Sequence, residues 1–579
     1  MTRKKYIFLT ALASGLLASH LLGPAQSALG NTVSEQQRQG LVAKYHLTTA
    51  DSWSNDLQTI VWNEAGRYYD IYFLHSADGA DEPFGDQGQD WYHTTTTDFI
   101  HFTEQNSAVS SHGGDDKEGW KSAWTGGVIE NKGQIKGAAV GEKVAYISGL
   151  RKDNGKQAIW ALASKDGGRT FSQVLNNGKP LLDGDWSWAS PNHIDERDPY
   201  VFSWNNKLYM YVAEGDVLGV YQSENGIDWS KADPAGKSKV EASTFFKGRS
   251  WQGNDPVECP VLKTMTLPNG QTKQVLFFGA KDARSGETTG TYYTVGHMDG
   301  NGLFVAERDV KRLDQGSDYY GANFTGSMDL GQSNSELISM GWVGNWNYSA
   351  NGVHADSEAS GSYIERLGSY SLARRLTLDA DWTIRQNFIY EAGLGASETF
   401  TNISKDRPKS VEGKTWVDRK DTNGNVYGLY DLPNQAVNKI YKLRFSSKEG
   451  NYIGRIYFDI WQGKDYVFFN YDPSNGMYNV KQYAGELDRG INGEFGSSYY
   501  YDGLLGHGNG YLAQSGLQDQ KEIELLVFTD KTSIEFVFPN GQSYTVARYS
   551  NSDQQDFKVF TEDPHNRNQL DMTVTEMKP

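Results

Sequence analysis

Short runs of alternating or continuous apolar residues dominate the chain, and Gly, Asn and Asp separate them. Clear examples lie at residues 67–74, 144–148, 207–213 and 274–278, each rich in Tyr, Phe, Val or Ile. Aromatic and β-branched runs bounded by turn-forming residues are typical of strands. Amphipathic helical patterns are scarce, and residues 33–43 form the best candidate, interpreted as a lead-in segment. The pattern therefore predicts an all-β protein.

One turn pattern recurs between these runs. A strand-like run ends in Ser, Thr or His, a turn centred on Asp or Asn follows, and Phe or Trp comes shortly after. The turn residues are Asp98, Asp166, Asn225 and Asp299, at intervals of about 65 residues. A repeat of this length that holds several strands indicates the blades of a β-propeller, and residues 49–380 leave room for roughly five. The alternative is a set of unrelated hairpins, because Asp-Gly and Asn-Gly turns are common in all-β proteins.

The turn pattern stops near residue 395, although strand-like runs continue. Longer runs follow at residues 452–461, 466–470, 522–528 and 532–538. They are typical of a β-sandwich, and the change places a domain boundary between residues 385 and 400. The prediction is a propeller domain followed by a sandwich domain, with bounds of 36–385 and 395–579.

The N-terminus has the layout of a secretory signal. A basic head at residues 3–5 precedes an apolar run at residues 6–22 and the small residues of 25–28. This order predicts a signal peptide over residues 1–28 that is removed by cleavage. An uncleaved membrane anchor is the alternative, since the run could almost span a bilayer. With cleavage, the protein is expected to be secreted, extracellular and free of the membrane.

Composition excludes some partners. The formal net charge of −17 argues against nucleic acid, because a phosphate backbone requires a positive surface.

Cys259 is the only cysteine, so no intramolecular disulfide can form. The 16 Trp, 34 Tyr and 25 Phe residues suit stacking on sugar rings but equally suit a β core. The His residues show no close spacing typical of zinc ligands, so no metal and no cofactor are expected. A monomer is expected.

Three segments carry acidic residues among aromatic residues and turn breakers at strand-like positions. They lie at residues 53–58, 196–199 and 255–260 and hold Asp56, Asp198 and Glu258. Retaining cleavage of a glycosidic bond needs two carboxyl groups about 5–5.5 Å apart. In a propeller such groups come from different blades, so their wide separation in sequence is expected. Taken singly, each acid could be a solvated surface group, and Asp-Pro usually marks a turn.

The order of these segments resembles glycoside hydrolase family 32, which contains invertases, inulinases and levanases. The motifs are Trp-Ser-Asn-Asp at residues 53–56, Arg-Asp-Pro at 197–199 and Glu-Cys at 258–259. Further segments similar to the family's signatures lie at residues 91–102, 124–127, 341–348 and 371–376. The resemblance covers nearly all of the mature chain. It implies a five-bladed β-propeller followed by a C-terminal β-sandwich.

The resemblance also implies roles. Asp56 would be the nucleophile that forms a fructosyl-enzyme, Glu258 the general acid and base, and Asp198 the residue that stabilises the transition state. Arg197 would fix carboxylate geometry through its planar guanidinium. The expected contacts with the substrate are Asn55, Gln58, His75, Trp91, Trp124, Thr125 and Trp342.

Some of these residues have other interpretations. The aromatic residues could be core residues, and His75 could be a buried structural histidine. Cys259 could be a nucleophile, but its place beside the acid in the family's motif favours a packing or supporting role.

The sequence departs from the family's pattern in places that bear on specificity. Leu57 follows the Asn-Asp pair where Pro is typical, and Gln58 is similar to levan-active members. The segment at residues 72–76, which contains His75, is also similar to those members. Ala373 and Arg375 replace the usual Pro and Glu of their motif, and these two changes suggest no function.

The prediction is a retaining fructan hydrolase of the levanase kind that favours β-2,6 linkages. Inulin and sucrose stay open as substrates, as does endo or exo cleavage. A fructosyltransferase that forms difructose anhydride or fructo-oligosaccharides would use the same carboxylates and is the second hypothesis. A non-catalytic fructan-binding protein is the third. Levansucrases share the propeller and Arg-Asp-Pro, but the Glu-Cys motif and the sandwich fit them poorly.

Overall fold

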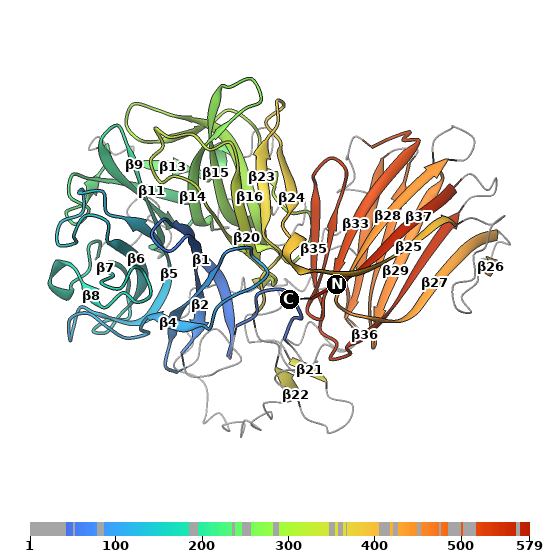
Figure 1. Cartoon of the computed structure of the whole chain (residues 1–579). Helices are drawn as coiled ribbons and strands as arrows, with labels where there is room; N and C mark the ends of the chain where they lie inside the picture. Colours follow the sequence, from blue (N-terminus) through green and yellow to red (C-terminus); the bar gives the residue numbers. More distant parts are fainter. Residues whose placement is uncertain are drawn as a thin grey trace, which may run out of the picture.

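Strands and short 3-10 helices make up the named elements of the chain (Figure 1). The computed structural model describes residues 42–49, 52–77, 86–183, 195–233, 238–245, 256–281, 289–346, 354–356, 363–365, 368–403, 417–420, 426–447, 453–473, 476–484, 499–501, 517–562 and 568–578. The prediction of an all-β protein is confirmed. The expected signal peptide lies outside the described residues, as does nearly all of the helix expected over residues 33–43.

Five sheets of four or five strands follow one another along the first part of the chain. The first contains β1 (Ser54–Asn63), β2 (Tyr68–Ser76), β3 (Gln89–Thr96) and β4 (Asn106–Val109). The second contains β5 (Trp120–Glu130), β6 (Lys143–Arg151), β7 (Gln157–Ala163) and β8 (Gln173–Val174). The third contains β9 (Arg197–Trp204), β10 (Lys207–Glu214), β11 (Val217–Ser223), β12 (Ser230–Lys231) and β13 (Lys239–Glu241).

The fourth and fifth sheets repeat the same antiparallel order. The fourth contains β14 (Glu258–Thr266), β15 (Thr272–Lys281), β16 (Thr289–Met298), β17 (Phe304–Ala306) and β18 (Lys311–Arg312). The fifth contains β19 (Tyr320–Phe324), β20 (Leu337–Trp342), β23 (Arg374–Leu378) and β24 (Ile384–Phe388). The hairpin β21 (His354–Asp356) and β22 (Tyr363–Glu365) is inserted in the fifth. The 3-10 helices are η1 (Asn176–Gly178), η2 (Ala242–Thr244) and η3 (Glu391–Gly393).

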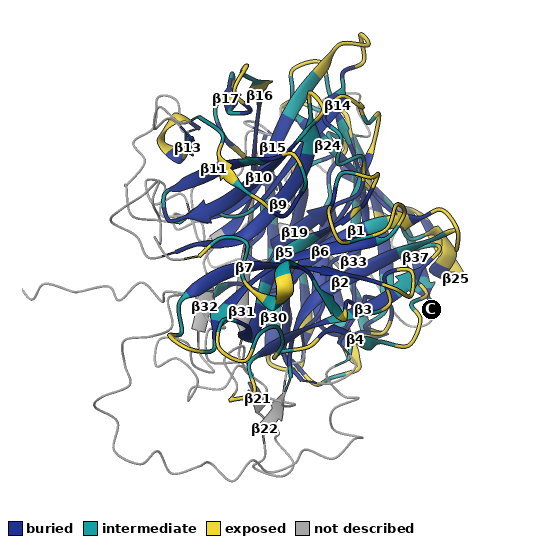
Figure 2. Ribbon diagram, turned by 90° about the vertical axis from the view of Figure 1, so that its left-hand side faces the viewer, coloured by how far each residue is buried: buried dark blue, intermediate teal, exposed yellow. Residues whose placement is uncertain are grey.

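The first strands of the five sheets contact one another in a closed cycle. β1 contacts β5, β5 contacts β9, β9 contacts β14, β14 contacts β19, and β19 contacts β1 again. Apolar clusters fill the space between neighbouring sheets, and one of them joins Ile60 and Ile71 of the first sheet to Tyr320 and Trp342 of the fifth. Most residues of these inner strands are buried for this reason, and Figure 2 shows much of their length in dark blue.

The recurring turns come directly after the third strand of each sheet. The side chains of Asp98, Asp166, Asn225 and Asp299 each accept hydrogen bonds from backbone N–H groups two to four residues ahead. Such bonds fix a tight turn locally. A fifth turn follows β23, where Asp381 accepts a bond of 3.0 Å from the N–H of Thr383. This fifth turn was not among those predicted from the sequence, although Asp-Ala-Asp-Trp at residues 379–382 marks it.

Two further sheets come after these five, and their strands share one apolar core. One contains β25 (Leu394–Ile403), β37 (Asn568–Met577), β28 (Lys439–Ser447), β33 (Glu522–Thr529), β34 (Ser533–Val537) and β35 (Ser543–Ala547). The other contains β26 (Val417–Lys420), β27 (Val426–Ala436), β36 (Gln554–Glu562), β29 (Arg455–Gln462), β30 (Asp465–Asp472), β31 (Met477–Ala484) and β32 (Tyr499–Tyr501). Burial alternates strictly along strands such as β30, because one face meets the core and the other does not.

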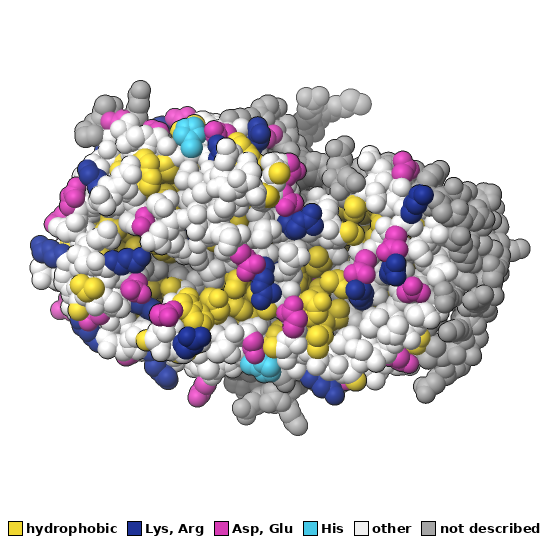
Figure 3. Space-filling view, turned by 45° about the horizontal axis from the view of Figure 1, so that its top comes forward, with side chains coloured by type: hydrophobic (Ala, Val, Ile, Leu, Met, Phe, Trp, Pro, Cys, Tyr) yellow, Lys and Arg dark blue, Asp and Glu magenta, His cyan; other side chains and the backbone are white. Residues whose placement is uncertain are grey.

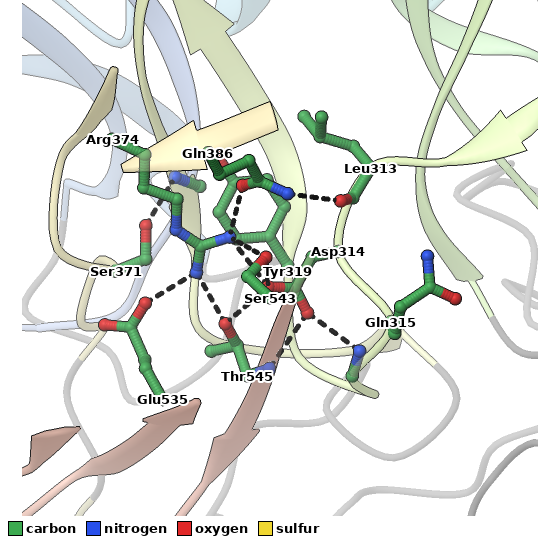
Figure 4. A network of polar contacts seen from close by, with 12 residues as sticks. Leu313, Asp314, Gln315, Tyr319, Ser371, Arg374, Gln386, Glu535, Ser543 and Thr545 are labelled. Carbon is green, nitrogen blue, oxygen red and sulfur yellow. Dashed lines mark hydrogen bonds and ion pairs between the residues drawn. The ribbon is translucent and has the colours of Figure 1, made fainter. Parts of the chain in front are cut away.

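A buried polar network joins the C-terminal sheets to the first part of the chain (Figure 4). At its centre, Arg374 Nη1 donates to Asp314 Oδ2 over 2.7 Å and Nη2 donates to Glu535 Oε2 over 2.5 Å. Its guanidinium carbon also lies 4.2 Å from the ring centroid of Tyr319. Nearby, His46 contacts Asp530 and Glu535 through its two ring nitrogens. A buried ion pair offsets the cost of removing its charges from water only when the partners are well aligned. These pairs therefore fix the orientation of the C-terminal sheets relative to the first part of the chain.

Candidate active site

The three candidate carboxylates lie near the beginnings of three first strands. Asp56 belongs to β1, Asp198 to β9 and Glu258 to β14. The residue after Glu258 links them, because Cys259 N donates to Asp198 Oδ2 over 3.0 Å. Cys259 Sγ lies 3.4 Å from Asp56 Oδ2 and 3.7 Å from Asp198 Oδ2. The structure therefore brings together the three acids that the sequence singled out.

β-Bulges turn these side chains toward one another. The pairing of β1 with β2 shifts between Ser54 and Leu57, and that of β14 with β15 shifts between Glu258 and Val261. The backbone of Asp198 has φ of 60° and that of Cys259 has φ of 49°. Each of these two residues precedes a proline, which has no N–H to offer the ladder. A bulge aims a side chain away from the regular pleat, as is common beside active sites.

Both oxygens of Glu258 have a donor. Arg197 Nη2 pairs with Oε1, and the hydroxyl of Tyr320 donates to Oε2. Arg197 Nη1 also lies 2.5 Å from Asp195 Oδ1. Arg197 thus lies between Asp195 and Glu258, and its role in fixing carboxylate geometry stays a prediction. Tyr320 was missed, because it comes from β19 and belongs to none of the quoted motifs.

Gly321 is a second residue that the sequence analysis missed. Its φ of 52° lies in the left-handed region that favours glycine. A Cβ atom at this position would lie 2.4 Å from Asp56 Oδ1, closer than any real contact. A glycine is therefore required where β19 passes the candidate nucleophile. Only a lone Gly between Tyr320 and Ala322 marks this in the sequence.

Burial and mutual repulsion control the protonation of the cluster. Desolvation, with the negative charges of Asp198 and Glu258, raises the pKa of Asp56 to about 7. Desolvation and Glu258 likewise raise the pKa of Asp198 to about 6, against the opposing charge of Arg197. Desolvation and the nearby carboxylates hold the pKa of the Cys259 thiol well above its usual value. A protonated thiol is a poor nucleophile, which favours the supporting role expected of Cys259.

Among the expected substrate contacts, Asn55 and Gln58 flank Asp56 and are buried. Asn55 Oδ1 accepts a bond of 3.0 Å from Gln89. The side chain of Gln58 donates to the carbonyl of Asp56 over 2.8 Å and accepts from Gly126 N over 2.7 Å. Gln58 has no exposed surface, and its side chain fixes the backbone that presents the acid. Direct contact with substrate stays a prediction for both.

The aromatic candidates divide by exposure. Trp124 is partly exposed, whereas Trp91 and Trp342 have no exposed surface. Trp91 Nε1 donates to the carbonyl of Trp124 over 2.9 Å, so the buried ring supports the exposed one. Trp342 packs edge-on against Trp53 with ring centroids 5.7 Å apart.

Thr125 and His75 complete the candidate set. Thr125 is buried and lies beside the cluster, where its side chain is one of the groups that lower the pKa of Asp198. His75 is buried, with Nδ1 2.8 Å from Asp90 Oδ1 and its ring stacked on Tyr92. These partners fit a structural role for His75, while its contact with a ligand stays a prediction.

Two acceptor atoms remain open in the cluster. Within the part of the chain that the structure describes, no donor reaches Asp56 Oδ1 or Asp198 Oδ1. Buried acceptors are normally satisfied, and exceptions concentrate at functional sites. Hydroxyl groups of a polyol could donate to both.

The described residues hold neither a metal cluster nor a membrane-spanning helix. No group of three or more His, Cys, Asp or Glu side chains there is arranged to hold a metal ion. None of the helices in that part of the chain has the length and apolarity needed to cross a membrane. On the face shown in Figure 3, acidic and basic side chains are interspersed.

Comparisons with known proteins agree with this geometry. The family model described as the glycosyl hydrolases family 32 N-terminal domain matches residues 46–387. A levanbiose-producing levanase of Bacillus subtilis (strain 168) is 29% identical over 427 residues, which are 72% of this chain and 76% of that protein. A levanbiose-producing levanase of Geobacillus stearothermophilus is 27% identical over 62% of this chain and 85% of its own.

Solved structures share the fold. An exo-inulinase of Aspergillus awamori has a TM-score of 0.67 and 17% identity, covering 92% of this chain and 98% of that chain. A fructofuranosidase of Schwanniomyces occidentalis complexed with fructose has a TM-score of 0.66 and 16% identity, covering 93% and 98%. At these identities the likeness extends to the fold alone.

Proposed function

The chain belongs to glycosyl hydrolases family 32, and from this we propose that it hydrolyses fructan with retention of anomeric configuration. The observation that carries the proposal is the meeting of Asp56, Asp198 and Glu258 around Cys259. Three strands from three sheets supply one acid each. Titratable side chains that meet in this way from separate elements are typical of an active site. Named relatives include levanases, exo-inulinases and a fructan β-fructosidase, all of which act on fructan by name.

The proposed reaction has two steps. Ionised Asp56 attacks the anomeric carbon of the fructosyl unit while Glu258 gives its proton to the leaving oxygen. Glu258 then takes a proton from water, which attacks the fructosyl-enzyme and releases fructose or an oligomer. Asp198, whose open Oδ1 faces no donor of the described chain, accepts hydrogen bonds from ring hydroxyls and stabilises the positive charge of the transition state.

The architecture belongs to the same proposal. The five sheets are the blades of a β-propeller over residues 36–385, and the closed cycle of first strands supports this. The C-terminal sheets form a β-sandwich over residues 395–579, supported by their common core. We also propose a cleaved signal over residues 1–28, secretion and a monomeric enzyme, on the sequence features given above.

Levan is the proposed substrate. Gln58 and the segment around His75 are similar to levan-active members of the family, and two relatives are levanbiose-producing levanases by name. Both residues are buried: Gln58 donates to the backbone carbonyl of Asp56, and His75 is paired with Ser54 of β1 and contacts Asp90. β-2,6 linkages are therefore proposed to be cleaved faster than the linkages of inulin or sucrose.

The test is to incubate purified protein with levan, inulin and sucrose separately and to resolve the products by chromatography. Asp56→Asn should lose at least a thousandfold in kcat, because the nucleophile is removed. Glu224→Gln, which changes an acid whose side chain is 75% exposed, should keep wild-type activity. Fructose or short β-2,6 oligomers from levan support the proposal, whereas a cyclic difructose indicates transfer. Wild-type inactivity on all three substrates would contradict hydrolysis and favour a binding protein.

A further inference from the structure

Strands β29 and β30 carry aromatic side chains on the face of their sheet that is turned away from the core; this sheet is part of the right-hand half of Figure 1. Alternate side chains of both strands belong to the shared apolar core. Because side chains alternate along a strand, the residues between them point to the opposite face, where they are at least partly exposed. We call this set the aromatic face, and its members are Tyr457, Asp459, Trp461, Tyr466, Phe468 and Asn470.

Each of three successive rungs of the β29–β30 ladder holds at least one aromatic ring. The register pairs Asn470 with Tyr457, Asp459 with Phe468 and Trp461 with Tyr466. The three rungs span about 13 Å, which is longer than one sugar ring. The ring centroids of Trp461 and Tyr466 lie 4.5 Å apart at 30°, and those of Tyr457 and Phe468 lie 5.9 Å apart at 28°. Rings held in this way suit contact with successive rings of a sugar chain.

Two acceptor atoms lie among these rings without a donor. Within the described part of the chain, no donor reaches Asp459 Oδ1 or Asn470 Oδ1. Buried acceptors are normally satisfied, and the exceptions concentrate at functional sites. Both side chains are partly exposed, and their terminal torsion angles are soft, so a rotation presents either oxygen to a ligand on the face.

The charges around Asp459 exclude an anionic ligand. Desolvation raises the pKa of Asp459 to about 6, and the charges of Asp431 and Asp556 add to this. Trp461 and Lys558 oppose the shift. At neutral pH Asp459 is therefore ionised and can only accept hydrogen bonds. Three acids beside one lysine repel phosphates and other anions, so the ligand that fits is neutral, rich in hydroxyl groups and apolar on its ring faces.

Both ends of the aromatic face are fixed. At one end Arg455 pairs with Asp472 across the two strands and adds no net charge. At the other end Asp465 Oδ2 accepts a bond of 3.0 Å from the N–H of Tyr549, whose ring packs in an apolar cluster made mostly of residues from the first part of the chain. A polymer bound to the face is therefore held on the same rigid molecule as the carboxylate cluster, which raises its local concentration there.

We propose that the aromatic face is a second carbohydrate site, which binds a neutral polysaccharide along β29 and β30. The aromatic rings contact sugar rings, while Asp459 and Asn470 accept hydrogen bonds from hydroxyl groups. The choice of fructan as the polysaccharide rests on the proposed function. The site itself uses none of the three carboxylates and lies on the C-terminal sheets.

The experiment compares Trp461→Ala with Trp62→Ala by electrophoresis in gels that contain levan, inulin or dextran. All proteins also carry Asp56→Asn, so the polymer stays uncut. The two tryptophans are matched, since they are 36% and 39% exposed and each packs against a tyrosine ring. Trp461→Ala should weaken binding to a fructan about tenfold, because a large aromatic contact and the joint action of two sites are lost. Trp62→Ala should migrate like its parent, and dextran should retard none of the proteins.

Trp461→Phe keeps an aromatic ring and should recover most of the binding, which a change that acts through misfolding would not explain. Equal retention of Trp461→Ala and Trp62→Ala in both fructan gels would overturn the inference. Retention that depends on Trp461 in dextran alone would also overturn it, because the ligand would not be a fructan. Dimerisation that Trp461→Ala abolishes, with retention unchanged, would show an interface between two copies of the chain instead.

Retention is measured without turnover, so this inference and the proposed function fail separately. A wild-type protein that cleaves no fructan, with retention that depends on Trp461, would contradict the function and keep the second site. Cleavage of fructan by a protein whose retention does not depend on Trp461 would do the reverse.

Discussion

Asp56 is held where ionisation is unfavourable. It is 5% exposed, and it faces the charges of Asp198 and Glu258. The folded-state pKa of about 7 lies above the ordinary value, so the folded protein holds this proton more tightly than the unfolded chain does. The contribution of protonated Asp56 to the free energy of unfolding is fully present below about pH 4 and is lost as pH rises through about 7. The carboxylate that we propose as the nucleophile thus opposes folding at neutral pH.

Asp56→Asn should therefore stabilise the protein while removing activity. Asparagine is neutral at every pH, so the gain should be small near pH 4 and reach about 1–4 kcal/mol in free energy of unfolding near pH 8. Denaturant unfolding followed by Trp fluorescence at both pH values measures this gain. Glu224→Gln, at an exposed acid, should show no such dependence on pH. A variant less stable than wild type at pH 8 would contradict the argument.

Cys259 reduces the repulsion between the negative charges of Asp56 and Asp198. Its backbone N–H and its thiol both face carboxylate oxygens, and the thiol stays protonated because its pKa is raised. A weak donor placed between two acids stabilises their ionised forms without adding a positive charge. This accounts for a lone cysteine that no disulfide needs.

At the scale of elements, the bulge in β19 matters as much as those that carry the acids. The pairing of β19 with β20 shifts between Tyr320 and Asn323, and Gly321 lies in that shift with its positive φ. The strand can approach Asp56 only because Gly321 has no side chain. The backbone geometry of β19 thus serves two acids, Asp56 through Gly321 and Glu258 through Tyr320.

Gly321→Ala should displace Asp56, the proposed nucleophile. The new Cβ would collide with the Asp56 carboxylate, and a shift of about 1 Å at a reacting group costs about a hundredfold in kcat. Gly270→Ala is the matched control, since Gly270 has φ of +82° but nothing within 4 Å of its Cβ position. Both variants should lose about 1–2 kcal/mol of stability from the left-handed backbone. Steady-state kinetics on levan should separate them, and equal kcat values would refute the steric argument.

Elements were more predictable than their distortions. The runs at residues 144–148 and 207–213 predicted strands, and β6 and β10 confirm them, because aromatic and branched residues between turn formers leave few alternatives. The carboxylates were found because their motifs carry a family resemblance. Tyr320 and Gly321 were not, since a bulge and a close approach depend on the register of a neighbouring strand. Local sequence does not encode that register.

At the scale of the whole molecule, the sequence predicted two parts but not how they meet. The runs at residues 522–528 and 532–538 were recognised as strands, and β33 and β34 confirm them. Their contacts with the first part depend on pairs such as His46 with Asp530 and Arg374 with Glu535, which lie 484 and 161 residues apart. A charged residue inside an ordinary strand pattern gives no sign of a distant partner. Only the assembled fold shows that these charges are buried.

Arg374 should be the most costly residue to replace at this junction. Arg374→Met removes the cation between Asp314 and Glu535 and leaves two buried carboxylates short of a partner, at a cost of about 3–5 kcal/mol in free energy of unfolding. Arg375→Met makes the same change at the next residue, whose side chain is 40% exposed and lies 3.5 Å from Glu336. Exposed pairs contribute at most about 1 kcal/mol, so this control should unfold close to wild type.

Denaturant unfolding of the two arginine variants, followed by Trp fluorescence, measures the difference. Asp314 begins the segment that β35 binds ahead of Tyr320. Arg374→Met should therefore also weaken the contact of Tyr320 with Glu258. Its kcat on levan should fall at temperatures where the protein is still folded, whereas kcat of Arg375→Met should not. Equal stability of the two variants would mean that the buried network adds nothing to the junction. Lower stability with unchanged kcat would mean that the junction supports the fold without reaching the active site.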